Sequence, residues 1–122
     1  MMRRLIALFA LTACVASPPV AEGRYSLISI DGVAFSARAT IDLSTPGQVS
    51  GNAPCNSFGG VLAAPLPAFD ASTITSTEMA CDDLPAEGQF FAALTAMTRA
   101  EVSDTQIVLS NAAGRSMIFV QP

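Results

Sequence analysis

Short runs of alternating apolar and polar residues, separated by turn-forming residues, predict β-strands along most of the chain. The two clearest runs are residues 24–30, followed by the turn dipeptide Asp31-Gly32, and residues 37–43. The sides of these strands predicted to be buried carry Tyr25, Leu27 and Ser29 in the first run and Ala39, Ile41 and Leu43 in the second.

Residues 44–47 (STPG) form the next predicted turn, and residues 48–51 the next strand. Further extended segments are predicted over residues 58–62 and 68–75. Pro65 and Pro67 lie between these segments, and because proline has no amide donor they indicate a sheet edge or a connection. Gly51, Gly59 and Gly60 indicate sharp bends or close approaches to other backbone.

One helix is predicted, from just after Asp82-Asp83 to about Thr98. An aspartate there can cap free N–H groups, and Pro85 falls in the first turn, where its missing donor costs little. Glu87 complements the positive end of the helix dipole. The apolar stripe that should face the core consists of Phe90, Leu94 and Met97, widened by Phe91.

The chain closes with a predicted hairpin of residues 105–110 and 115–120, joined by Asn111-Ala112-Ala113-Gly114. Both arms are apolar at nearly every position, which predicts burial on two sides or closure of a curled sheet over the helix. The predicted fold class is therefore mainly β, a curled antiparallel sheet or partial barrel packed against one helix.

The N-terminal residues have the pattern of a secretory signal, with Arg3-Arg4 followed by a short apolar run. The run ends in Leu11-Thr12-Ala13-Cys14, which resembles a bacterial lipobox, so Cys14 is predicted to be lipidated. Residues 1–13 would then be the signal, 14–23 a tether and 24–122 the domain. The alternative is an ordinary signal cut near Ala16 or Ala21.

Charge and residue usage exclude several function classes. The 122-residue chain has no histidine and no lysine, and without its signal it keeps four arginines against ten acidic residues, so binding to nucleic acid or anionic lipid headgroups is not expected. The missing histidines exclude Ser-His-Asp and Cys-His catalysis. The acidic cluster of Glu78, Asp82, Asp83 and Glu87 matches no calcium loop. No catalytic residue, metal or cofactor is predicted.

If Cys14 is removed or lipidated, Cys55 and Cys81 remain as an even pair in an exported chain, which favours a disulfide. Two buried free thiols or a metal-binding pair are the alternatives. The lack of histidine argues against the metal pair.

The order of these motifs resembles the META domain, or HslJ-like, family over roughly residues 24–121. The resemblance rests on the early aromatic Tyr25, residues 49–51 leading into Cys55-Asn56-Ser57-Phe58-Gly59-Gly60, residues 77–81 (TEMAC), the helix from Glu87 and the closing strand 116–119. It implies a mainly β fold in exported or envelope-anchored bacterial proteins, some linked to stress, without an agreed activity. Tyr25 stands where the family commonly has Trp, and Pro54 where it has Gly.

These observations predict a noncatalytic lipoprotein of the cell envelope, facing the periplasm from the outer membrane, that contributes to envelope maintenance or stress tolerance. It would bind a protein or an envelope component, act as a monomer and touch the membrane only through the lipid. The predicted contact loop carries Asn52, Asn56, Ser57 and Phe58, although the same loop could simply turn the chain around a disulfide. The alternatives are a carrier of a small apolar ligand and an inhibitor of a periplasmic hydrolase.

Overall fold

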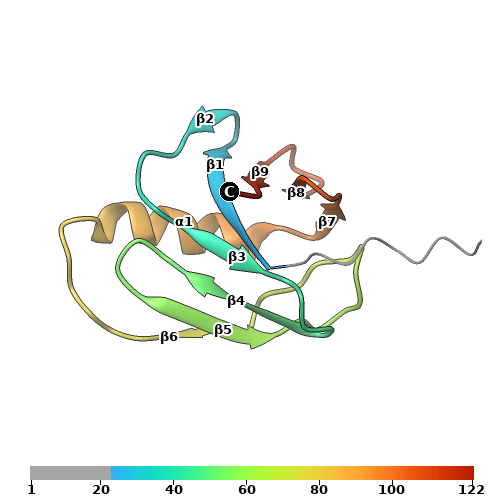
Figure 1. Ribbon diagram of the computed structural model, residues 1–122, viewed down its shortest axis with the longest axis horizontal. Coiled ribbons are helices and arrows are strands. Elements are labelled where there is room, and N and C mark those ends of the chain that lie inside the picture. Colours follow the sequence, from blue (N-terminus) through green and yellow to red (C-terminus); the bar gives the residue numbers. More distant parts are fainter. Residues whose placement is uncertain (1–22) are drawn as a thin grey trace, which may run out of the picture.

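Nine antiparallel strands form a single curled sheet with one helix packed against it in the computed structural model, which describes residues 23–122 (Figure 1). The elements in chain order are β1 (Arg24–Ile30), β2 (Val33–Ala34), β3 (Thr40–Asp42), β4 (Gln48–Asn52), β5 (Ser57–Val61), β6 (Thr75–Ser76), α1 (Leu84–Ala96), β7 (Arg99–Val102), β8 (Gln106–Ser110) and β9 (Ser116–Val120). The predicted fold class is confirmed.

The strand order across the sheet is β6-β5-β4-β3-β1-β9-β8-β7, and β2 pairs with β1 outside this path. The two ends of the sheet differ. Beside β7, the amide of Phe69 donates to Thr98 (2.9 Å) and the amide of Ala100 donates to Pro67 (2.8 Å), so the 67–69 segment covers part of that edge. Within residues 23–122 no strand pairs with the outer edge of β6.

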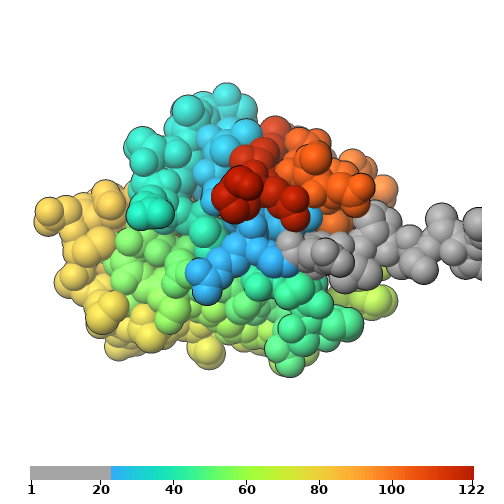
Figure 2. Space-filling view, viewed as in Figure 1, coloured from blue at the N-terminus to red at the C-terminus, as the bar shows by residue number. Residues whose placement is uncertain are grey.

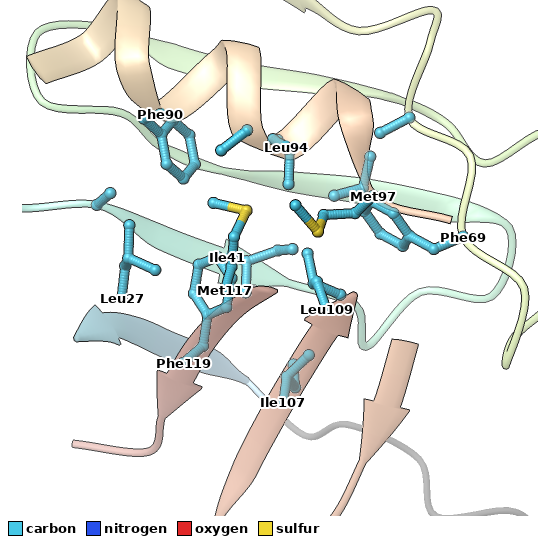
Figure 3. Packing of buried hydrophobic residues seen from close by; sticks show 14 of the residues in the cluster. Leu27, Ile41, Phe69, Phe90, Leu94, Met97, Ile107, Leu109, Met117 and Phe119 are labelled. Atoms are coloured by element: carbon cyan, nitrogen blue, oxygen red, sulfur yellow. The ribbon is translucent and has the colours of Figure 1, made fainter. Parts of the chain in front are cut away.

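The core lies between α1 and the sheet, and the predicted helix stripe supplies its centre (Figure 3). Phe90, Leu94 and Met97 are fully buried, as are Ile41 and Phe119 from the sheet. The alternation in residues 37–43 predicted its buried side correctly. Removal of this apolar surface from water stabilises the fold by about 25 cal/mol for each Å² buried.

One buried position in β1 was predicted wrongly. The pairing of β1 with β9 shifts register between Leu27 and Ser29, which is a β-bulge. Because the extra residue reverses the alternation, Ile30 is buried in place of Ser29, and Ile28 is exposed.

The ends of α1 also differ in detail from expectation. Asp83 is the N-cap residue, but its side chain makes no capping hydrogen bond, so the predicted aspartate cap is wrong. Pro85 does lie in the first turn. The helix stops at Ala96, and the next residues enter β7, a strand that the sequence pattern did not predict. Within residues 23–122, no helix is long and apolar enough to cross a bilayer.

Two further expectations about strands need correction. In β8 and β9, fully buried residues alternate with partly buried ones, so only one face of the hairpin is completely covered. Of the extended segment predicted over residues 68–75, only Thr75, the first residue of β6, is in a strand, apart from a single bridge between Ala68 and Arg99. The predicted signal, Cys14 and the tether through residue 22 lie outside the described residues.

The predicted close approaches are real at two glycines. A Cβ at Gly51 would overlap the carbonyl group of Thr40, and one at Gly60 would come within 2.9 Å of backbone atoms of Thr73 and Ile74. Gly59 has only ordinary contacts.

Candidate binding groove

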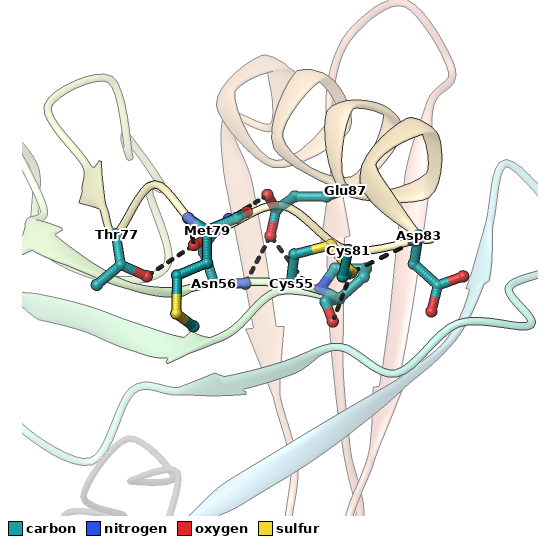
Figure 4. Close-up of a disulfide and its surroundings, with 8 residues drawn as sticks. Cys55, Asn56, Thr77, Met79, Cys81, Asp83 and Glu87 are labelled. Carbon is teal, nitrogen blue, oxygen red and sulfur yellow. Dashed lines mark hydrogen bonds between the residues drawn. A yellow bond between two sulfur atoms is a disulfide. The ribbon is translucent and has the colours of Figure 1, made fainter.

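A disulfide joins the two cysteine segments beside the start of α1 (Figure 4). Cys55 and Cys81 are bonded, with their Cα atoms 5.7 Å apart, across a sequence separation of 26. The predicted disulfide is confirmed, and the alternatives of free thiols or a metal pair are wrong. The bond attaches the loop after β4 to the segment that connects β6 to α1.

Asn56 fixes the same connection by hydrogen bonds. Its Nδ2 donates to the carbonyl of Met79 (3.0 Å), and its Oδ1 accepts from the amide of Met79 (2.6 Å) and the hydroxyl of Thr77 (2.9 Å). The side chain is only 6% exposed. A buried side-chain amide that bonds both the N–H and the C=O of one residue fixes the backbone position of that residue. Asn56 therefore holds the 77–79 segment in place.

Glu87, in the first turn of α1, bonds Asn56 and the loop before it, and we call Asn56 and Glu87 together the polar clamp. One carboxylate oxygen, Oε1, accepts from the amides of Cys55 (3.0 Å) and Asn56 (2.8 Å), and Oε2 accepts from Asn56 Nδ2 (2.7 Å). Glu87 is 6% exposed, and the described residues include no ion pair to it. Sequence reasoning assigned Glu87 to the helix dipole and missed this role, because its donors lie 31 and 32 residues earlier in the chain.

Two adjoining hollows lie where the clamped segment faces α1. The larger, of about 440 Å³, lies between residues 76–80 and the first two turns of the helix. The smaller, of about 320 Å³, lies between residues 74–76 and the later turns. Ser76 and Phe91 line both hollows, so together they form one groove between β6 and α1.

The groove has an apolar floor and rim. Phe91 is partly buried in its floor and meets the buried Phe58 edge-on, with ring centroids 5.5 Å apart. Met79 and Leu84 at the rim are 63% and 43% exposed, which is high for large apolar side chains. Figure 2 shows the chain that follows β6, coloured yellow, at the surface on the left end of the molecule.

The predicted contact loop is only partly available for binding. Asn52 and Ser57 are exposed, but Asn56 and Phe58 are each 6% exposed. Asn56 is occupied by the clamp, and Phe58 packs against both Phe90 and Phe91 in the core. These two residues are therefore corrected from surface contacts to structural residues, because the alternation of β5 turns Phe58 inward.

The groove residues Met79 and Leu84 were not predicted as a site. Their only signal in the sequence was that each is a large apolar residue in a polar segment, beside Glu78 and Asp83. That signal does not reveal that a helix and a sheet edge bring the two together.

The acidic cluster is divided by the fold. Glu87 turns inward, whereas Glu78, Asp82 and Asp83 remain at the surface. Within residues 23–122, no group of three or more histidine, cysteine, aspartate or glutamate side chains is arranged to hold a metal ion. The hydroxyl of Thr77 and the carboxylate of Glu87 are both committed to Asn56.

Comparison with known proteins identifies the family, since the family model for the META domain matches residues 18–122. The chain belongs to the META domain family. An NMR structure of a protein from Burkholderia xenovorans is similar to this META domain with a TM-score of 0.66 and 26% identity, over 84% of this chain and 83% of that one. A second NMR structure, 19% identical with a TM-score of 0.60 over 83% and 90% of the two chains, supports the fold alone. No curated protein matches this META domain.

Proposed function

We propose that this META domain is a noncatalytic binding module of the bacterial envelope, and that the groove between β6 and α1 takes a protein or an envelope component. The observation that carries the proposal is the exposure of Met79 and Leu84 at the mouth of a preformed groove. Large apolar side chains at the rim of a hollow are typical of binding sites.

The groove is also held in place before a partner arrives. The disulfide and the Asn56–Glu87 clamp fix one wall to the helix that forms the other. A site that is already ordered loses less conformational entropy on binding, which favours affinity. The same clamp uses the hydroxyl of Thr77 and the carboxylate of Glu87, two groups of the groove that could otherwise act as a nucleophile or an acid.

A carrier of small apolar ligands would need room inside the curled sheet. The helix side chains Phe90, Leu94 and Met97 occupy that space in this domain. The surface groove is therefore the better candidate, and its partner would meet the domain from outside.

The proposal includes a lipid anchor at Cys14, export to the periplasm and attachment to the outer membrane, in support of envelope maintenance or stress tolerance. A Cys14→Ser variant should leave the membrane fraction, whereas the unmodified chain should remain there. A variant that still sediments with membranes would contradict the anchor.

Site-specific photocrosslinking in cells tests the groove. A photoreactive residue replaces Met79, and the matched control carries it at Val33, which is 68% exposed and lies on β2 outside the groove. We expect a discrete adduct from position 79 and none of the same mass from position 33. Equal adduct patterns at the two positions, or none at either, would count against a binding groove.

A further inference from the structure

The outer edge of β6 carries unpaired backbone groups at the groove. Thr77 donates its amide to the carbonyl of Ser57 (3.1 Å), and the next residue pair along the ladder is Phe58 with Ser76. Residue pairs in an antiparallel ladder alternate between bonded and non-bonded, so Ser76 is in a non-bonded pair with β5. Its N–H and C=O therefore point away from the sheet, toward the open edge.

The two hollows follow one another along this edge, and two helix residues that line them are spaced like alternate residues of a β-strand. Gly88 lines the larger hollow and Ala92 the smaller one, and four helical residues advance by about 6 Å. Alternate side chains of a strand project to the same face about 6.6 Å apart. A strand added beside Ser76 could thus place residues i and i+2 in the two hollows, over Phe91.

The charge around the groove favours a cationic occupant. Glu78 lines the larger hollow, and Asp82 and Asp83 are exposed just before α1. No arginine of the described residues lines either hollow, and two of the four, Arg99 and Arg115, already pair with acidic partners elsewhere. Complementary charge promotes encounter and selects among partners.

We propose that an extended segment of another protein binds by adding a strand to β6, with two apolar side chains at alternate positions and lysine or arginine beyond them. This inference rests on the proposed binding function and names its partner. A second copy of this chain would bring its own Glu78 against the first, and anionic lipid would meet three surface carboxylates. Both occupants are disfavoured by like charge.

The test uses a synthetic peptide, acetyl-KTLTFTKK-amide, titrated into the isotope-labelled full chain and followed by NMR. Leucine and phenylalanine in this probe stand at alternate positions for the two hollows. We expect amide shifts at residues 74–80 and along the exposed side of α1. Replacing every lysine of the probe by glutamate should weaken binding about tenfold or more, since attraction becomes repulsion.

N-methylation of the probe tests strand addition directly. Methyl groups on the amides of leucine and phenylalanine, or on those of the three threonines, block opposite edges of the added strand. One of the two methylated probes should lose at least about tenfold in affinity because its main-chain bonds to β6 are lost, while the other binds nearly as before. Equal affinities would overturn strand addition.

Two variants of the chain provide the matched evidence. Ser76→Pro removes the outward N–H without removing a bond to β5, and should weaken the probe about two- to tenfold. Glu78→Gln should weaken it about two- to fivefold, whereas Glu101→Gln, on β7, should leave it unchanged. If Ser76→Pro disturbs the fold, the Glu78 and Glu101 pair still decides the charge requirement.

The remaining outcomes separate this inference from the proposed function. If the probe fails to bind while position 79 still crosslinks a partner, strand addition by a cationic segment is overturned and the binding groove stands. If neither occurs, both fail. Concentration-dependent shifts at Ser76 without any probe would mean that a second copy occupies the edge, and would also overturn the inference.

Discussion

Replacing the Glu87 carboxylate by an amide tests whether the polar clamp stabilises the domain. In Glu87→Gln the side chain keeps its shape but has only one acceptor oxygen. That oxygen can serve either the amides of Cys55 and Asn56 or the Nδ2 group of Asn56, because these donors bond different carboxylate oxygens. Whichever it serves, an N–H group of the new amide faces another donor.

The cost follows from the number of groups left without partners. A buried polar group without its hydrogen bond costs about 1–3 kcal/mol, and two groups are affected, so the free energy of unfolding should fall by about 2–6 kcal/mol. With a urea dependence of about 2 kcal/mol per molar, the unfolding midpoint should drop by about 1–3 M. The measurement is urea unfolding of the oxidised protein by circular dichroism.

Glu101→Gln is the control, because it makes the same chemical change at an exposed residue. Its effect should stay within about 0.5 kcal/mol. A polarity swap adds a second check, since Asn56→Asp places an acceptor opposite the new amide. The double variant Asn56→Asp with Glu87→Gln should be more stable than the sum of the single losses by about 1 kcal/mol or more. A Glu87→Gln midpoint equal to that of the control would refute the clamp.

Three other predictions concern the fold. Replacing both cysteines of the disulfide by serine should lower the free energy of unfolding by about 3 kcal/mol in urea, and an unchanged midpoint would contradict this. Gly51→Ala should destabilise the domain by about 1–3 kcal/mol, because the new Cβ would overlap backbone atoms. Gly88→Ala, on an open helix surface, should stabilise it by about 0.5–1 kcal/mol. Melting temperatures that shift in the same direction for both variants would refute the comparison. Hydrogen bonds from the Arg115 side chain and the Ser116 amide hold the pKa of Asp31 below its ordinary value. The stability that the ionised Asp31 contributes is therefore present above about pH 4 and is lost as the pH falls through the lowered pKa. Arg115→Gln should raise the carboxyl titration midpoint of Asp31 in NMR, and an unmoved midpoint would contradict the assignment.

The spacing of apolar residues within a single strand or helix was sufficient to predict which side of that element is buried. Residues 37–43 and the stripe on α1 showed their buried sides because period-2 and period-3.6 spacing survive in the structure. The side of β1 was mispredicted at Ser29, since a bulge is a property of the pairing between two strands and leaves no mark in one of them. The strand β7 was missed for a related reason, because RAEV is short and its partner lies in the final hairpin.

The site shows the same limit more strongly. The pairing of Cys55 with Cys81 could be predicted because an even pair of cysteines has few options in a chain that is predicted to be exported. The groove could not be predicted, because its width depends on the distance between Ser76 on β6 and Phe91 on α1. Asn56 looked like a loop residue that could meet a partner, and only the three-dimensional arrangement reveals that its amide is already used.

The polar clamp has a consequence for the formation of the disulfide. Asn56 donates to the carbonyl of Met79 and Glu87 accepts from the amide of Cys55, so these contacts hold the two cysteine segments together without the sulfur atoms. In a folded chain whose disulfide is reduced, the thiols of Cys55 and Cys81 would therefore meet at a far higher effective concentration than two free thiols in solution. An oxidant would close this pair without having to bring the two segments together.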